Sequence, residues 1–126
     1  MTPGVTLDAG GLIALDRDDR RVVVLLARAR ETGARVTIPA SALAQAIRRP
    51  ERQVLLARLI RQPGTDVIDL GPVDATHVGR LLAASGTSDI ADAHVVICAR
   101  RADQPVVTSD PGDLRQLDPA LRLIAL

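Results

Sequence analysis

Short apolar runs alternate along this chain with longer stretches in which apolar residues recur every three or four positions. The short runs, which are typical of buried strands, cover residues 4–8, 35–38, 67–70, 106–108 and 121–126. Helical spacing covers residues 11–15, 20–32, 40–47, 51–61, 75–84, 90–102 and 114–117. Alternation of strands with helices predicts an α/β fold, in which helices cover both faces of a parallel sheet.

Length and composition fit one folded domain over residues 1–126. The chain is 47% apolar and 25% charged, which favours folding over disorder. Aromatic residues are absent, which excludes base-stacking RNA-binding modules. All 16 basic residues are arginine, and without lysine neither P-loop nor Schiff-base chemistry is available.

Charge and hydropathy predict a soluble cytoplasmic protein without a membrane segment. The net charge is +1, so only local arginine clusters could attract nucleic acid. The single cysteine, Cys98, excludes an intramolecular disulfide. No apolar run approaches the ~20 residues of a membrane span, and residues 1–10 lack the pattern of a signal peptide.

Three aspartates are predicted to meet at one edge of the sheet. Asp8 ends the first predicted strand, Asp110 follows the strand over 106–108, and Asp92 lies near the start of the helix that leads into that strand. Carboxyl ends of parallel strands share the edge where ligands bind. Crowded carboxylates resist joint ionisation, and a hard cation relieves this, so we predict a Mg²⁺ or Mn²⁺ site.

Helix capping is the competing interpretation for each of these acids. Asp8, Asp89 and Asp110 all stand where an N-cap is expected, and Asp113 stands where a negative charge suits the helix dipole. Asp74 is likewise predicted to cap the helix over 75–84. Asp89 could also hold outer-shell water or orient the next acid, three residues on.

The remaining reactive side chains have structural or auxiliary interpretations. Thr108 and Ser109 either bring a hydroxyl near the metal or reflect strand propensity and capping. His94 lies about 200° around its helix from the nearest acid, which favours a packing role. Cys98 is predicted to be a small core residue, and His77 a surface residue.

The chain resembles a PIN domain, and closely resembles the toxin of VapBC toxin–antitoxin pairs. Three segments carry the resemblance, Val5–Leu15, Asp92–Arg100 and Val106–Asp110, with Thr37–Gln45 matching in position and pattern. The resemblance covers the whole chain. It implies a three-layer fold with a five-stranded parallel sheet in the order 3-2-1-4-5.

The resemblance also implies a Mg²⁺-dependent endoribonuclease that is held in check by a small antitoxin protein. The family's acids carry over to Asp8, Asp92 and Asp110, but Gln45 stands where the family has a glutamate. Gln45 keeps an acceptor oxygen and loses the charge. Two outcomes stay open: a nuclease with Gln45 as an auxiliary residue, or a weakened or inactive relative that still binds RNA or an antitoxin.

Partner surfaces are suggested by arginines and by apolar helix faces. Two arginine groups could contact RNA phosphates or could be solvated helix ends: Arg17, Arg20 and Arg21, and Arg48, Arg49 and Arg52. Apolar faces within residues 12–15, 22–29 and 54–60 would form the antitoxin groove of the family, and a homodimer is plausible by the same analogy. A haloacid-dehalogenase phosphatase fits less well, because that pattern needs an aspartate where Gly10 stands.

Overall fold

The computed structural model describes residues 4–126 and contains one sheet of five parallel strands. The strands are β1 (Val5–Leu7), β2 (Val36–Pro39), β3 (Thr65–Ile68), β4 (Val106–Thr108) and β5 (Leu123–Ala125). Their order across the sheet is β3-β2-β1-β4-β5, and each neighbouring pair is parallel. This confirms both the α/β class and the strand order that the resemblance implies.

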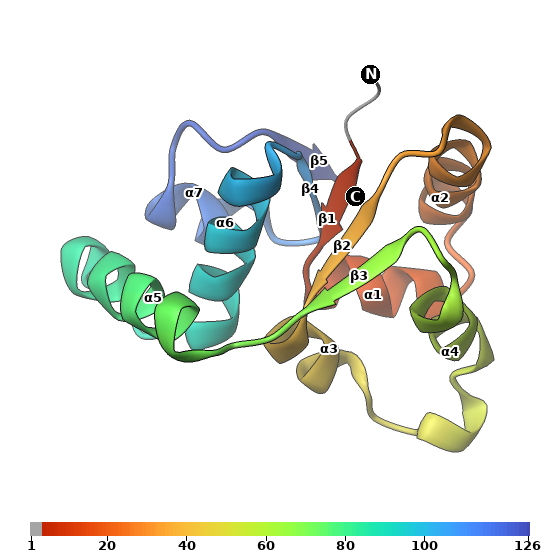
Figure 1. Cartoon of the computed structure of the whole chain (residues 1–126), viewed down its shortest axis with the longest axis horizontal. Coiled ribbons are helices and arrows are strands. Elements are labelled where there is room, and N and C mark those ends of the chain that lie inside the picture. The colour runs from red at the N-terminus through yellow and green to blue at the C-terminus, as the bar shows by residue number, and fades with distance from the viewer. Residues whose placement is uncertain (1–3) are drawn as a thin grey trace.

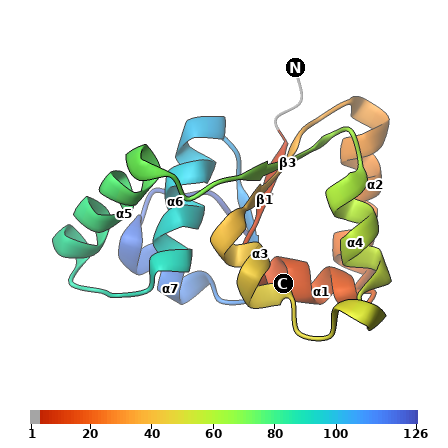
Figure 2. The same ribbon diagram turned by 60° about the horizontal axis from the view of Figure 1, so that its bottom comes forward.

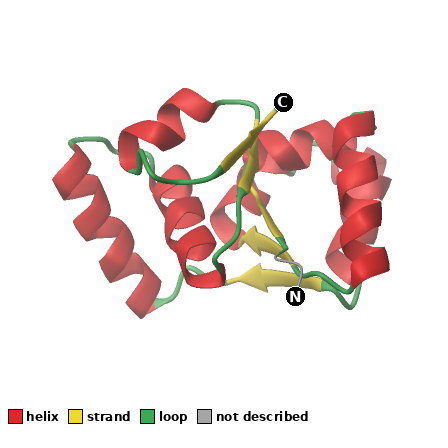
Figure 3. Cartoon of the chain, turned by 90° about the horizontal axis from the view of Figure 1, so that it is seen from above, coloured by secondary structure: helices red, strands yellow, loops and turns green. Residues whose placement is uncertain are grey.

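Two groups of helices enclose the sheet (Figures 1 and 3). The helices are α1 (Ala9–Asp16), α2 (Arg20–Thr32), α3 (Ala40–Ala46), α4 (Val54–Arg61), α5 (Pro72–Ser85), α6 (Ile90–Ala102) and α7 (Pro111–Leu117), with a 3-10 turn η1 (Pro50–Arg52). Helices α5, α6 and α7 lie on one side, and α1, α2 and α4 lie on the other (Figure 1). Over residues 4–126 no helix alone is long and apolar enough to cross a membrane; α5 and α6 reach that length only as a pair bent by 112°.

Aliphatic side chains build most of the core. Strands β1 and β4 are buried at every position, and Leu7, Leu12 and Ile38 are fully enclosed. Helix α6 buries seven of its 13 residues because it lies against β1 and β2 on one side and contacts α3, α5 and α7 elsewhere. The small residues of this helix, alanine above all, allow these neighbours to approach closely.

The ends of α2 agree with the sequence prediction, whereas the starts of α5 and β3 differ from it. The Asp19 side chain caps α2, and Gly33 ends it with a left-handed φ of 71°. The prediction that Asp74 caps a helix is wrong: α5 begins earlier, at Pro72, with Gly71 at the cap. The third strand was also placed two residues late, since its pairing with β2 starts at Thr65.

The carboxyl edge of the sheet carries the shortest connections. Helix α1 follows β1 after a single residue, Asp8, and α3 follows β2 with none. Both helices therefore start at the same edge and contact each other, as Figure 2 shows with this side turned forward. Helix α3 also contacts α6, so three helices converge where the predicted acids lie.

Candidate metal centre at the carboxyl edge

Asp8 is held at the junction of β1 and α1. The register pairs Leu7 with Val107, which places the next two residues, Asp8 and Thr108, side by side. One carboxylate oxygen of Asp8 accepts the Gly11 N–H at 2.8 Å, so the residue caps α1 as well as ending β1. Burial raises the pKa of Asp8, although the hydroxyl of Thr108 acts in the opposite direction by hydrogen bonding.

Two glycines let the first turn of α1 lie against the end of β4. A Cβ at Gly11 would stand 2.7 Å from the carbonyl oxygen of Val107, and one at Gly10 would collide with the hydroxyl of Ser109. The Ala-Gly-Gly sequence is therefore what brings Asp8 close to the end of β4. The Ser109 side chain contributes to this junction by lying directly against Gly10.

Thr108 links Asp8 to Asp110. Its fully buried hydroxyl accepts the Asp110 N–H at 2.9 Å while it lies within hydrogen-bonding reach of Asp8. The Asp110 side chain makes no capping bond to α7, although Pro111 occupies the first helical position as expected. Its carboxylate instead lies close enough to Asp113 to raise the pKa of that residue by a shared hydrogen bond and like charge.

Asp92 lies where all of these charges act together. Burial raises its pKa to about 6, and the nearby charges of Asp89, Asp8, Asp113 and Asp110 add to the rise. Asp89 also caps α6, since its carboxylate accepts the Asp92 N–H at 2.9 Å. Asp89, Asp92 and Asp113 line a hollow of about 260 Å³ that Thr87, Ser88, Gln116 and Leu117 complete. Five aspartates therefore form one electrostatic cluster, which we call the acidic site.

The acidic site is open rather than tightly closed. Within residues 4–126, the one group of three potential metal-binding residues whose ligand atoms lie within 4.8 Å of one another is Asp74, His94 and Cys98. Asp8, Asp92 and Asp110 are more widely spaced than that, because each is anchored by a different element. Electrostatic coupling through Asp92, rather than direct contact, joins them. An all-oxygen set of this kind suits a hydrated hard cation, which keeps several waters.

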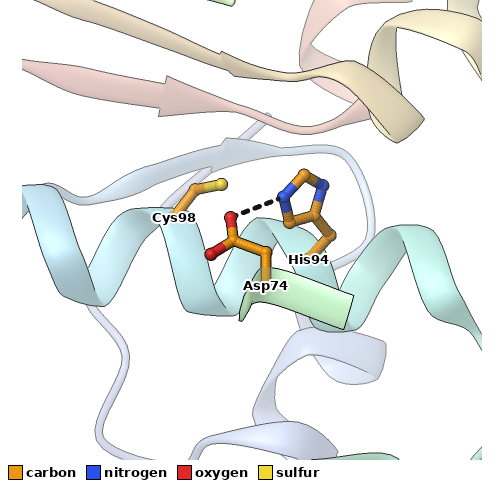
Figure 4. A group of neighbouring side chains, drawn as sticks. All are labelled: Asp74, His94 and Cys98. Carbon is orange, nitrogen blue, oxygen red and sulfur yellow. Dashed lines mark hydrogen bonds and ion pairs between the residues drawn. The ribbon is translucent and has the colours of Figure 1, made fainter. Parts of the chain in front are cut away.

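Asp74, His94 and Cys98 form a buried group of polar side chains between helices (Figure 4). His94 is fully buried; its Nε2 lies 3.1 Å from a carboxylate oxygen of Asp74, and its Nδ1 lies 2.9 Å from the hydroxyl of Ser41. Sequence reasoning placed His94 in the core and missed both partners. These hydrogen bonds tie α5, α6 and α3 together.

Charge balance distinguishes the buried group of Asp74, His94 and Cys98 from the acidic site. Arg101 pairs with Asp74 and, together with His94, lowers the pKa of that carboxylate. Burial raises the pKa of the Cys98 thiol to about 12, so it stays protonated. Asp74 and Arg101 already neutralise each other, so this buried group needs no added cation. We therefore interpret it as a structural brace.

The other predicted residues fall into two groups. Gln45 lies exposed on α3, the helix that contacts both α1 and α6. Arg17 joins the second arginine group around one hollow of about 430 Å³, lined by Arg17, Arg48, Arg49 and Arg52. Arg20 and Arg21 lie outside that hollow, and Arg21 is paired with Asp19 at 2.7 Å. RNA contacts of either arginine group stay predictions.

Solved structures with the same fold include VapBC and FitAB complexes. The chain aligns with VapBC2 from Rickettsia felis at a TM-score of 0.67 and 15% identity, covering 97% of this chain and 98% of that one. DNA-bound VapBC from Salmonella typhimurium gives 0.67 and 19%, covering 98% of each chain. FitAcB from Neisseria gonorrhoeae gives 0.63 and 16%, covering 95% and 96%. At these identities the likeness establishes the fold.

Family assignment comes from the sequence itself. A search among curated proteins returns no significant match. The family model of the PIN domain, in contrast, matches residues 5–118, which include all five aspartates of the acidic site. The chain therefore belongs to the PIN-domain family.

Proposed function

We propose that this protein is a Mg²⁺- or Mn²⁺-dependent endoribonuclease that acts as the toxin of a toxin–antitoxin pair. The observation that carries the proposal is the gathering of five carboxylates at one sheet edge, where Asp8 ends β1, Asp110 follows β4 and Asp92 lies in the first turn of α6. Burial and these neighbouring charges raise the pKa of Asp92. Such a cluster favours binding of a divalent cation. PIN-family membership and the toxin–antitoxin complexes among its structural neighbours support the same function.

The proposed roles follow from where each side chain is anchored. Asp8, Asp92 and Asp110 would hold the cation, which would supply Lewis-acid stabilisation and an activated water for attack at phosphorus. The buried hydroxyl of Thr108 fixes the backbone at Asp110, and it lowers the pKa of the neighbouring Asp8 by hydrogen bonding. Gln45 would position water through its amide, since it cannot take a proton. Asp89 and Asp113 would hold outer-shell water and keep the local potential negative.

RNA cleavage with a matched pair of variants tests the proposal. Purified protein should cut a fluorogenic RNA with Mg²⁺ or Mn²⁺ and stop when EDTA is added. Asp8→Asn should reduce the rate at least about 100-fold, since one ligand and its charge are lost. Asp69→Asn, at an exposed aspartate outside the acidic site, is the control. Equal cleavage by wild type and Asp8→Asn would identify a contaminant or another site.

The glutamine at position 45 makes a non-catalytic binding module the alternative. Gln45 is exposed on α3 and removes one negative charge from the family's pattern. Gln45→Glu restores it. If the wild-type protein fails to cut RNA and Gln45→Glu cuts it, the natural protein is a binding module. Cleavage by the wild type excludes that alternative.

An antitoxin is the proposed protein partner, and the apolar face of α2 and α4 is its proposed groove. Two adjoining hollows of about 600 and 240 Å³ share the side chains of Leu26, Arg30, Leu59 and Gln62. A groove of this kind suits an amphipathic helix. Co-expression with the product of a neighbouring short reading frame should yield a complex that Leu26→Glu disrupts. Sedimentation of the free protein tests the homodimer that we propose by analogy.

A further inference from the structure

Four arginines from two separate segments surround one hollow, which we call the arginine pocket. Arg17 ends α1, and Arg48, Arg49 and Arg52 belong to the segment between α3 and α4. Asp16 is the one acidic side chain in the lining of this hollow of about 430 Å³. The pocket therefore concentrates positive charge on a protein whose net charge is only +1.

The arginines of this pocket are free to bind an anion. Five other arginines of the described chain form ion pairs: Arg21, Arg35, Arg100, Arg101 and Arg122. Over residues 4–126 none of the four pocket arginines does. Each guanidinium offers a planar set of N–H donors that matches phosphate or carboxylate oxygens. Grouped without counter-charge, they create a local potential that attracts anions.

The backbone of the pocket is held by one buried side chain. Gln53 is 6% exposed and accepts the N–H groups of Arg48 and Arg49 at 2.9 and 3.1 Å. Its amide N–H donates to the carbonyl of Ala46 at 2.8 Å. The turn that carries the arginines is thereby fixed to the end of α3, so a bound anion need not order the backbone first.

Helix α1 connects the arginine pocket to the acidic site. Asp8 caps its start and Arg17 its end, nine residues later. At 1.5 Å per residue these two residues lie about 14 Å apart along the axis. Successive phosphates of one strand are at least about 3.4 Å apart, so at most about four phosphates span this distance. A single RNA strand can therefore reach both sites.

We propose that the arginine pocket binds backbone phosphates of the same RNA strand whose scissile phosphate lies at the acidic site, a few nucleotides away. This inference rests on the proposed function. A carboxylate-rich peptide is the other ligand that the chemistry allows. The shared helix favours RNA, because one strand can place a phosphate at the cation proposed for the acidic site at one end of α1 and further phosphates at the pocket at the other end.

Binding of a fluorescein-labelled, unstructured RNA of about 12 nucleotides tests the inference by fluorescence anisotropy. Ca²⁺ replaces Mg²⁺, and a gel checks that the RNA stays intact. The pocket variant is Arg17→Gln with Arg48→Gln; the matched control is Arg61→Gln with Arg80→Gln, at two exposed arginines elsewhere. The slope of log affinity against log salt should fall by about 1.4 in the pocket variant, with roughly tenfold weaker binding.

A phosphate scan then tests the distance between the two sites. RNAs carrying one uncharged methylphosphonate at successive positions should bind the wild type more weakly at one or two adjacent positions. The pocket variant should be insensitive at those positions, because the contact is already lost. Equal salt slopes for wild type, pocket variant and control overturn the inference, as does pocket-dependent binding of a poly-glutamate peptide alone.

The binding assay tests the arginine pocket and the cleavage assay tests the nuclease proposal, so one can be rejected without the other. Cleavage without a pocket effect on binding rejects the arginine pocket and leaves the nuclease proposal in place. A pocket effect on binding without cleavage supports phosphate binding at the arginine pocket, but it rejects the nuclease proposal and with it a scissile phosphate at the acidic site. The two results therefore distinguish a wrong contact surface from a wrong activity.

Discussion

Replacing Asp92 by asparagine measures directly how strongly the carboxylates of the acidic site interact. Burial and the neighbouring charges raise the pKa of Asp92 from 3.8 to about 6. Each pKa unit corresponds to about 1.4 kcal/mol, so this shift corresponds to about 3 kcal/mol before screening. Asp92 is only half-buried, and solvent screening reduces the expected effect to about 1–2 kcal/mol.

The sign follows from the direction of the pKa shift. Because the folded protein holds the Asp92 proton more tightly than the unfolded chain does, stability falls as the pH rises from about 4 to about 6. The loss is complete above that window. Asp92→Asn cannot ionise and so avoids this loss of stability. At about pH 7.5 its melting temperature should therefore be roughly 3–8 °C above that of the wild type. At about pH 3.5, where Asp92 is protonated in both states, the variant should melt close to the wild type.

Thermal unfolding followed by circular dichroism, with and without Mg²⁺, gives the readout. Saturation at 100 times the dissociation constant should stabilise the wild type by about 2.7 kcal/mol and Asp92→Asn by less. Asp69→Asn should change neither value. If Asp92→Asn is neutral or destabilising at about pH 7.5 and Mg²⁺ leaves the wild type unchanged, the carboxylates do not share one site.

Three further predictions concern folding. Asp8→Asn keeps the oxygen that caps α1 and removes a charge whose pKa burial raises, so in urea at neutral pH it should be at least as stable as the wild type; Asp8→Ala should be about 1 kcal/mol less stable than Asp8→Asn. Gly11→Ala should cost about 1–3 kcal/mol because its Cβ meets a β4 carbonyl; Gly79→Ala, with open space around it in α5, should gain about 0.5–1 kcal/mol. His94→Ala should cost about 3 kcal/mol, clearly more than Cys98→Ala, and equal losses would reject the brace.

The sequence predicted the fold well because local and long-range signals agree. Buried strands appear as short β-branched runs, and Pro or Gly marks most of the breaks. The main error, the position of β3, has a physical cause. Its residues are not fully buried, and Thr65 and Asp66 pair with β2 at the edge of the sheet without an apolar pattern. An edge strand shows less of the hydrophobic signal on which sequence reasoning depends.

The acidic site was predictable in outline, since the acids follow strands or start helices at one sheet edge. Sequence could not show that the Thr108 hydroxyl holds the backbone at Asp110, or that Asp8 caps α1 while it contributes to the site. It also missed that Gln53 holds the arginine turn, because a buried glutamine leaves no periodic signal. These roles depend on residues that meet only after the sheet has formed.

Asp74 and Asp92 show why charge balance, rather than the mere presence of an acid, identifies the functional group. Both lie near the start of a helix on the same side of the sheet. Arg101 and His94 lower the pKa of Asp74, so its negative charge is already compensated within the fold. Asp92 has only acids as charged neighbours, and its pKa rises. Only the second arrangement gains from a cation, so we propose that the chemistry takes place at Asp92, although the first offers the tighter ligand geometry.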